Sequence, residues 1–336
     1  MRIGTHDLDE RVLVMAEIGN NHEGSVGLAE ELIGLAAAAG ADAVKLQTID
    51  PELLVSPRET QRIAQLNRFR LADEDWPRLA RVAGEAGVLF LSTPFSLPAV
   101  DRLVSLVDAF KIASGDNDFL PLLDAVARTG KPVIVSTGMS DLEGVRRAKD
   151  VIDAAWRTLP ADPGLVVLQC TVSYPTIAAD ANLGALRDLA TLGVTVGYSD
   201  HTIGVEAATL SVGLGARVIE KHFTIDKAYS DFRDHRLSAD PPEFAELVRR
   251  VRLAEELLGS GVKEVLPVEA DVAPLVRRGL AAAADLPAGR VLEPSDVVWV
   301  RPASAIRPGE ESRVLGHRLV RAVERGDPLE VESVEP

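Results

Sequence analysis

Eight short runs of β-branched and other apolar residues recur between residues 12 and 219, and each is followed by a stretch of helical length rich in Ala, Leu, Glu and Arg. This alternation is typical of consecutive βα units around a parallel sheet. Eight parallel strands are the number that closes a barrel. We therefore predict a (β/α)8 TIM barrel of class α/β, with strands at residues 12–16, 43–46, 88–92, 109–113, 133–136, 165–169, 195–197 and 216–219.

Two of the intervening stretches carry helix signals. Residues 25–41, SVGLAEELIGLAAAAGA, begin with a serine that can cap a helix and end near a glycine. Residues 241–261, PPEFAELVRRVRLAEELLGSG, place Leu247, Val251, Ala254 and Leu258 on one helical face. Both are predicted to be outer helices. The interval 49–73 is long for a βα connection and rich in charge, which predicts a lid or an extra helix.

The pattern of the sequence changes near Lys263. From there, alternating apolar segments, prolines and turn signals replace the βα pattern. A chain of 336 residues is also longer than one core usually supports, since single domains seldom exceed roughly 300 residues. We predict a barrel over residues 1–262, a linker over 263–276 and a small β-rich domain over 277–336.

The charge and the cysteine content restrict the classes of partner and the compartment. A formal net charge of -15 argues against a broad nucleic-acid or anionic-membrane surface, since both require clustered Lys and Arg. The single cysteine, Cys170, has no partner for an internal disulfide and is expected to be a small buried side chain. The N-terminal residues contain neither a signal-peptide core nor a membrane span, so a cytoplasmic location is expected.

Polar residues stand at the ends of the predicted strands. In a (β/α)8 barrel the C-terminal strand ends meet at one mouth, where the chemistry of the fold takes place. Single serines and threonines at such positions are also common helix caps and turn formers. Taken one at a time, Ser92, Ser136 and Thr137 are explained at least as well by such a structural role. The whole set is Glu17, Asn20, Asn21, Lys45, Gln47, Ser92, Thr93, Lys111, Ser114, Asp116, Ser136, Thr137, Thr171, Tyr174, Ser199, His201, Lys221 and His222.

Lysines and histidines in this set indicate the chemistry of the ligand. A buried ammonium without an anionic partner is costly, so Lys45 and Lys111 favour a bound anion, and the nearby hydroxyls suit a phosphorylated, carboxylated molecule. His201 and His222, at equivalent places on neighbouring strands, could share a divalent ion. Asp234 and His235 follow the eighth strand and either reach the same mouth or belong to a solvated loop.

At these residues the sequence resembles the N-acetylneuraminate (sialic acid) synthase family. The resemblance covers almost the whole chain, because residues after about Arg277 resemble the antifreeze-protein-like (SAF) domain that ends these synthases. Each motif alone is weak, and together they are specific. The matching stretches are AEIGNNHEG (16–24), VKLQT (44–48), STPF (92–95), FKIASGD (110–116), KPVIVSTGM (131–139), CTVSYP (170–175), GYSDHTIG (197–204) and EKHFT (220–224).

The resemblance implies a condensation of phosphoenolpyruvate with an aldose, typically an N-acylated mannosamine, that releases phosphate and gives a nonulosonic acid. Lys45 and Thr93 would hold the carboxylate of phosphoenolpyruvate. Its phosphate would be held by Lys111, Ser114, Ser136 and Ser199.

The same resemblance assigns the other substrate and the ion. Mn2+ or Mg2+ would be bound by His201 and His222, and act as a Lewis acid on the aldehyde. Glu17 would face the reacting end of the sugar, and Asp116 could orient or deprotonate the water that adds at C2. Sugar hydroxyls would contact Gln47, Tyr174 and Asp234.

The C-terminal domain carries one further implied site residue. Arg301, in VRPAS, matches an arginine that the family inserts into the active site of the partner subunit, which implies a domain-swapped homodimer.

Departures from the family pattern concern mainly the sugar side. Asp116 stands where many bacterial members carry Glu, and Ser96 replaces a common Asp. FRDHRLS differs from the usual PGPDH lead-in. Phe119, Val172 and Gln169 occupy positions where Asn, a polar residue and His are usual, so the sequence leaves the acceptor open.

Three other readings fit the same residues. One is another phosphoenolpyruvate-dependent aldulosonate synthase with a different aldose. A second is a Schiff-base aldolase using Lys45 or Lys111, if burial lowered the pKa of that lysine. The third is a sugar-binding or scaffold protein that has kept the fold and lost activity, which fold alone does not exclude.

Overall fold

The computed structural model describes residues 1–335 and divides the chain into two compact units, residues 1–259 and 260–336. The first boundary lies three residues before the one predicted from sequence. Among the described residues no helix is both long and apolar enough to cross a membrane.

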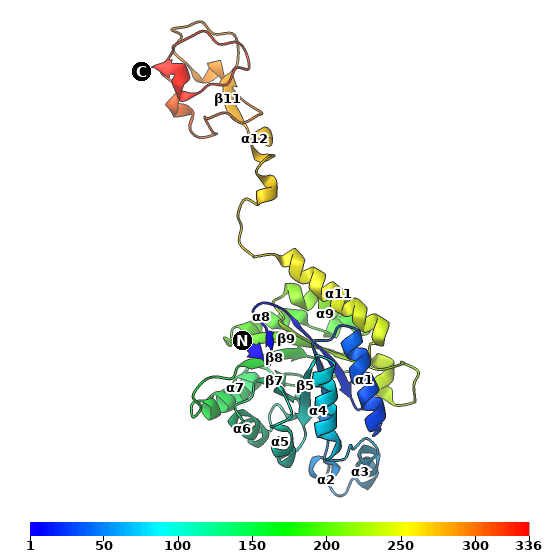
Figure 1. The fold of residues 1–336 in the computed structure, drawn as a ribbon. Coiled ribbons are helices and arrows are strands. Elements are labelled where there is room, and N and C mark those ends of the chain that lie inside the picture. The colour runs from blue at the N-terminus through cyan, green and yellow to red at the C-terminus, as the bar shows by residue number, and fades with distance from the viewer. Residues whose placement is uncertain (336) are drawn as a thin grey trace. The chain divides into compact units, whose positions relative to one another are not determined.

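Eight parallel strands close into a barrel in the first unit, in the order β10-β3-β4-β5-β6-β7-β8-β9 (Figure 1). The predicted barrel is therefore confirmed. The strands are β3 (Leu13–Gly19), β4 (Ala43–Thr48), β5 (Leu89–Pro94), β6 (Ala109–Ile112), β7 (Val133–Ser136), β8 (Leu165–Cys170), β9 (Thr195–Asp200) and β10 (Val218–His222).

Helices cover the outer face of the barrel, and their apolar sides form the larger of its two cores with the outward side chains of the strands. Ser25 caps α1 by accepting a hydrogen bond from the Leu28 amide, as predicted. The outer helices are α1 (Val26–Ala38), α4 (Asp75–Glu85), α5 (Leu97–Leu103), α6 (Leu120–Arg128), α7 (Leu142–Trp156), α8 (Leu186–Ala190), α9 (Glu206–Gly213) and α11 (Pro241–Leu258).

Along α11, the predicted apolar face is buried at Leu247 and Val251, but Leu258 at its end is 48% exposed. The long predicted connection contains two short helices, α2 (Pro51–Leu54) and α3 (Thr60–Asn67), and α10 (Arg233–Leu237) follows β10.

A second apolar core fills the lower part of the barrel interior. An N-terminal hairpin, β1 (Arg2–Ile3) and β2 (His6–Asp7), brings Ile3 and Leu8 into it, and both side chains are fully buried. We call this core the floor. It consists of Ile3, Leu8, Leu13, Met15, Ala43, Leu89, Leu91, Ala109, Ile134, Val166, Leu168 and Val218.

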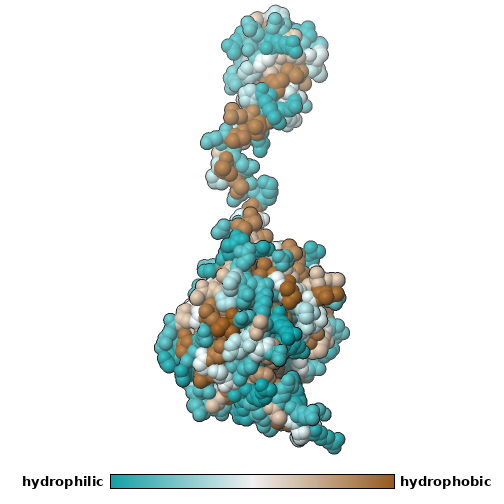
Figure 2. Space-filling model, turned by 90° about the vertical axis from the view of Figure 1, so that its right-hand side faces the viewer, coloured by the Kyte–Doolittle hydropathy of each residue, from teal (hydrophilic) through white to brown (hydrophobic). Residues whose placement is uncertain are grey.

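Residues 260–336 contain two small antiparallel sheets and their own apolar core. β11 (Gly279–Ala282) pairs with β12 (Val297–Val300), and β13 (Arg318–Leu319) pairs with β14 (Val334–Glu335). Leu280, Leu319 and Leu329 are at most 1% exposed in this core. The preceding segment includes α12 (Ala273–Val276), and Figure 2 shows hydrophobic groups gathered along it. Val268, in this segment, is 81% exposed.

Candidate active site

The strands place polar side chains directly above the floor because side chains of a strand alternate between its two faces. On β3, Leu13 and Met15 belong to the floor and Glu17 is the next residue on that face. On β10, Val218 belongs to the floor, and Glu220 and His222 follow at spacings of two. We call the resulting set the polar layer: Glu17, Lys45, Thr93, Lys111, Ser136, Cys170, Ser199 and Glu220.

This layer lies at the bottom of a cavity of about 900 Å³. Seven of its eight members line the cavity, Thr93 being the exception. Eleven of the fourteen predicted site residues line this cavity. The predicted residues that line it are Glu17, Lys45, Gln47, Lys111, Ser114, Ser136, Tyr174, Ser199, His201, His222 and Asp234.

The three predicted residues that do not line this cavity lie in different places. Thr93 is fully buried, and its hydroxyl has no hydrogen-bond partner within the protein. Asp116 lies in a short 3-10 helix, Ser114–Asp116, whose other two residues do line the cavity. Arg301 is exposed and belongs to the second unit.

Both lysines of the polar layer are ion-paired. Lys45 Nζ lies 2.7 Å from Glu17 Oε1 and 3.9 Å from Glu220 Oε2, and Lys111 Nζ lies 3.7 Å from Glu220 Oε1. Lys111 also donates hydrogen bonds to Ser136 Oγ at 2.6 Å and to the Ile112 carbonyl at 3.0 Å. The sequence analysis assigned the negative charge near these lysines to a bound anion. In the structure, two buried carboxylates of the protein already offset part of their charge.

Glu220 is the site residue that the sequence analysis missed. Burial raises the pKa of this carboxyl, but Lys111 and Lys45 outweigh burial and hold the pKa at about 2. Ser199 Oγ donates to Glu220 Oε1 at 2.7 Å. A signal was present in the sequence, since a glutamate two residues before His222 in an apolar strand must share the face of that histidine.

The pKa values of the two lysines shift in opposite directions. Burial lowers the pKa of Lys111, and the carboxylate of Glu220 only partly opposes this effect. Lys45 behaves in the opposite way: burial lowers its pKa, but the neighbouring Glu17 and Glu220 outweigh burial, so the pKa of Lys45 is raised. Of the two ammonium groups, Lys111 is thus the one held less firmly in its charged form.

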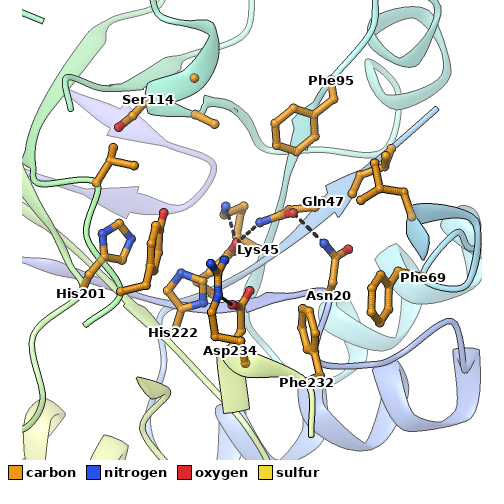
Figure 3. Close-up of a pocket in the computed structure, with 18 of the residues that line it drawn as sticks. Asn20, Lys45, Gln47, Phe69, Phe95, Ser114, His201, His222, Phe232 and Asp234 are labelled. Carbon is orange, nitrogen blue, oxygen red and sulfur yellow. Dashed lines mark hydrogen bonds and ion pairs between the residues drawn. The ribbon is translucent and has the colours of Figure 1, made fainter. Parts of the chain in front are cut away.

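The two histidines lie side by side at the edge of the polar layer, with ring centroids 5.4 Å apart (Figure 3). The Thr171 carbonyl lies 2.9 Å from His201 Nδ1 and can only accept, so Nδ1 carries a hydrogen, and in the neutral ring the lone pair lies on Nε2. Burial lowers the pKa of His201, but the contacts of its ring with Cys170 and the Thr171 carbonyl outweigh burial and raise it. Burial lowers the pKa of His222 well below its usual value, and its Nδ1 has no partner within the protein. Neutral imidazoles with free lone pairs are the form that binds a metal ion.

These residues fit a divalent ion held by two imidazoles. Among residues 1–335 there is no cluster of three or more His, Cys, Asp or Glu side chains with the geometry of a complete ion site. The chain would therefore supply His201 and His222, and water or substrate oxygens would supply the other ligands.

Aromatic and amide side chains occupy the rest of the cavity. Tyr174 stacks on His201, with ring centroids 4.3 Å apart, and Arg233 lies 5.1 Å above the Tyr174 ring. Gln47 Nε2 donates to Glu17 Oε1 at 3.0 Å, and Asn20 Nδ2 donates to Gln47 Oε1 at 2.8 Å.

Several polar residues at the strand ends serve the fold instead. Lys221, on the opposite face of β10 from Glu220, forms a buried ion pair with Asp200 at 2.8 Å. Asn21 donates to the Phe223 carbonyl, and the Ser92 and Thr48 hydroxyls share a hydrogen bond. Thr137 donates to the Leu168 carbonyl, as expected for a structural threonine.

The residues that depart from the family pattern also lie in different places. Val172 lines the cavity and is 39% exposed, whereas Phe119 is exposed outside the lining. Gln169 is buried and donates to the Ala181 carbonyl. Cys170 is buried, as predicted, and its Sγ lies 3.9 Å from His201 Nδ1. His235 is buried, while its neighbour Asp234 lines the cavity.

The chain is similar to known proteins over both of its units. Residues 32–263 match the NeuB family, and residues 277–334 match the SAF domain. The chain is 39% identical to the N,N'-diacetyllegionaminic acid synthase of Legionella pneumophila, over 96% of this chain and 94% of that one. It is 31% identical to the N-acetylneuraminate-9-phosphate synthase of Mus musculus, over 96% and 92% of the two chains.

A solved structure is similar as well. The N-acetylneuraminic acid synthetase of Leptospira borgpetersenii superimposes with a TM-score of 0.76 at 31% identity, covering 81% of this chain and 94% of that one. The predicted SAF domain and the predicted enzyme class, a synthase of the N-acetylneuraminate type, are confirmed by these matches. The chain belongs to the NeuB family.

Proposed function

We propose that the chain condenses phosphoenolpyruvate with an N-acylated mannosamine-type aldose, releasing phosphate and forming a nonulosonic acid. The observation that carries this proposal is the polar layer, where Lys45 and Lys111 lie beside the imidazoles of His201 and His222 in one cavity. An anionic donor and an oxygen-rich acceptor need this combination of groups.

Phosphoenolpyruvate would bind against the lysines. Lys111 and Ser136 are already hydrogen-bonded to each other and would hold the phosphate together with Ser114 and Ser199. Its carboxylate would take Lys45, which would then be shared with Glu17, and the unpartnered hydroxyl of Thr93. Binding of this anion would raise the pKa of Lys111, because a nearby negative charge favours the charged form of the ammonium group.

The aldose would bind on the side of Gln47, Tyr174 and Asp234, with its aldehyde near Glu17. His201 and His222 would hold Mn2+ or Mg2+ there, and a bound cation supplies Lewis-acid polarisation of a carbonyl group. Holding both substrates in one cavity removes much of the entropic part of the barrier.

The overall reaction balances with one water molecule. The C3 carbon of phosphoenolpyruvate forms a bond to the aldehyde carbon, water adds at C2, and the C2–O bond to phosphate breaks. Burial raises the pKa of Asp116 to about 6, and its Oδ2 has no partner within the protein. At neutral pH this carboxylate could therefore accept the proton of the water.

A homodimer completes the proposal, with Arg301 of one chain reaching the aldose in the barrel of the other. Exposed apolar side chains along residues 262–276, including Val265, Val268 and Leu275, support a covering partner for this segment.

The test is phosphate release by the purified chain with phosphoenolpyruvate, Mn2+ and a panel of N-acylated hexosamines, with mass spectrometry of the product. Phosphate formed together with a nonulosonic acid supports the proposal. An absence of phosphate across the whole panel contradicts it, and product from an unrelated aldose would indicate another aldulosonate synthase.

The lowered pKa of Lys111 favours one alternative, a Schiff-base aldolase. Borohydride treatment in the presence of pyruvate separates the two functions. A covalent adduct on Lys111 would support the aldolase, and an unmodified lysine supports the synthase.

A further inference from the structure

The chain after β10 runs along the cavity and then returns to its starting point. Phe223 and Ala239 form a parallel β-bridge, and the Thr224 amide donates to the Ala239 carbonyl at 3.0 Å. Between these ends, residues 230–234 all line the cavity, and Figure 3 shows Asp234 among the lining side chains. We call residues 225–238 the β10 loop. The proposed function gives Asp234, in this loop, a contact with the aldose.

The β10 loop cannot keep its shape through local interactions alone. Its helix α10 has only five residues, and no side chain of the described residues caps its N-terminus. Isolated helices of this length are unstable, because few backbone hydrogen bonds offset the cost of ordering the chain. Contacts with other segments must therefore fix the position of Asp234.

His235 supplies such contacts. It follows Asp234 on α10, and its side chain is fully buried, whereas that of Asp234 lines the cavity. Its Nδ1 lies 2.6 Å from Thr224 Oγ1, just before the β10 loop, and its Nε2 lies 3.1 Å from Glu23 Oε1 in the loop after β3. A carboxylate can only accept, so Nε2 carries a hydrogen and donates it to Glu23. The imidazole thus joins the β10 loop to two other segments.

Glu23 takes a strained backbone conformation where it makes this contact. Its φ of 47° lies in the left-handed region, which is unfavourable for a residue that has a Cβ atom. Its Oε1 accepts a hydrogen bond from Ser230 Oγ as well as from His235, so one carboxylate oxygen holds the β10 loop at two positions. Strain of this kind persists only where surrounding contacts maintain it. The contacts of Glu23 with the β10 loop are of that kind.

The imidazole of His235 also supports aromatic residues of the β10 loop. The rings of Tyr229 and Phe232 have centroids 5.2 and 5.9 Å from that of His235. Phe232 in turn contacts Phe69 on the other side of the cavity opening, with centroids 4.6 Å apart. Loss of the imidazole would therefore loosen the packing of the loop together with its hydrogen bonds.

The donor side of the cavity is fixed independently of this loop. Lys45 and Lys111, which are proposed to hold phosphoenolpyruvate, lie on β4 and β6, and both residues are paired with a neighbouring strand of the barrel. Glu23 and His235 belong to the loops that follow β3 and β10. A change at either of these two residues should therefore affect the aldose more than phosphoenolpyruvate.

We propose that Glu23 and His235 form a latch that sets the position of Asp234, and that both are positioning residues for the aldose. This inference rests on the proposed function and adds to it the device that fixes the acceptor side of the cavity. His235 acts through Asp234, because its own side chain is buried and does not line the cavity.

The first test measures both Michaelis constants of His235→Ala, with the N-acylated hexosamine that the wild type turns over fastest. The KM for the aldose should rise by roughly tenfold because Asp234 is displaced, and the KM for phosphoenolpyruvate should change by less than about twofold. A KM does not depend on the fraction of folded molecules, so a partly unfolded variant still gives a result. His235→Gln should keep more of the affinity, because its amide N–H can still donate to Glu23.

Arg236→Ala is the matched control for these measurements. Arg236 follows His235 on α10, its side chain is 73% exposed, and it does not line the cavity. Both Michaelis constants should stay at their wild-type values in this variant.

The second test is a double-mutant cycle of His235→Ala with Glu23→Ala, because Glu23 lines the cavity and a direct contact with the aldose must be separated from the latch. If the two residues act as one latch, the double variant should have a KM for the aldose close to that of the more affected single variant. Independent roles would instead multiply the two effects.

Hydrogen exchange of the intact chain tests the latch without any turnover. The amides of the β10 loop should exchange roughly tenfold faster in His235→Ala than in the wild type, because the loop opens more often once its contacts are lost. The amides of β3 and β10 should keep their protection.

The outcomes separate the latch from the function on which it rests. A wild-type KM for the aldose in His235→Ala, equal increases in both Michaelis constants, or unchanged exchange in the β10 loop would each overturn the latch and leave the synthase function intact. Effects that multiply in the double variant would overturn it as well. A wild-type chain that releases no phosphate with any acceptor would contradict the proposed function, and hydrogen exchange would still decide whether Glu23 and His235 hold the loop.

Discussion

The floor and the polar layer of the barrel are built by the same eight strands but differ in what their inward side chains contribute. Leu13 and Met15 on β3 pack in the floor, and Glu17 on the same face begins the polar layer. The backbone pairing continues through both, since Glu17 is still aligned with Lys45 and with His222. The strand ladder therefore positions both layers, and only the side chains separate stability from chemistry.

The energetic balance of the two layers is opposite. Apolar burial in the floor stabilises the fold by roughly 25 cal/mol per Å². A buried ion pair such as Lys45 with Glu17 must overcome a desolvation penalty, and apolar replacements of buried ion pairs are often neutral or stabilising. We infer that the polar layer is maintained for the reaction, while the floor carries the stability of the barrel.

The largest expected effect is on activity and comes from Lys111→Met. Loss of the buried charge proposed to hold the phosphate should lower kcat/KM by roughly 10³-fold or more, and the melting temperature should also fall, because Glu220 is left with Lys45 alone as a counter-charge. Steady-state phosphate release and a thermal melt measure the two effects. Lys149→Met is the control, because this lysine pairs with Asp153 on the outer helix α7. Near wild-type activity in Lys111→Met would contradict the role of the polar layer.

The next effect is on stability and comes from the floor. Leu91 is fully buried, and Leu91→Ala should lower the free energy of unfolding by about 2–5 kcal/mol. Denaturant titration measures the loss, and kcat per folded molecule should stay close to that of the wild type. A stable but inactive Leu91→Ala variant would show that the two layers are not separable.

Much of this division could be predicted from the sequence. Apolar runs at βα spacing predicted the barrel, and polar residues at strand ends predicted most of the cavity lining, including Lys45, Lys111, His201 and His222. Most predicted strand ends were too early, and three of them by three residues: β3 continues to Gly19, β9 to Asp200 and β10 to His222. Polar side chains do not end a strand when they point into a cavity and the backbone ladder continues.

Other features depend on contacts that no local pattern contains. The spacing of Glu220 from His222 marks its face of the strand, but its ion pairs with Lys45 and Lys111 join segments far apart in the chain and could not be predicted. The contact between Phe69 and Phe232 joins loops that are far apart in the chain, and nothing in the sequence predicted that either residue lines the cavity. Lys221 shared the strand-end position of His222 but faces the other side of β10, where Asp200 neutralises it.

A smaller activity effect is expected from Asp116, which lies beside the polar layer rather than in it. Because burial raises its pKa to about 6, the carboxylate required as a base is lost as the pH falls through about 6. The rate should therefore decline below that pH. Asp116→Asn should reduce kcat by roughly 10²-fold and remove this acidic limb from the pH–rate profile. Retention of the limb in the variant would assign it to another group.

The smallest effect is expected from outside both layers, at Arg301. If the second unit of one chain completes the barrel of another, Arg301→Ala should raise the KM for the aldose by roughly tenfold. Stability should change little, because the exposed side chain of Arg301 contributes little to the free energy of folding. Arg307→Ala, an exposed arginine of the same unit, is the control.

Mixing Arg301→Ala chains with Lys111→Met chains gives a sharper test, because a swapped heterodimer contains one site with both residues intact. Sites with the wild-type KM should then reappear on mixing, and their absence would show that each barrel depends on its own C-terminal unit.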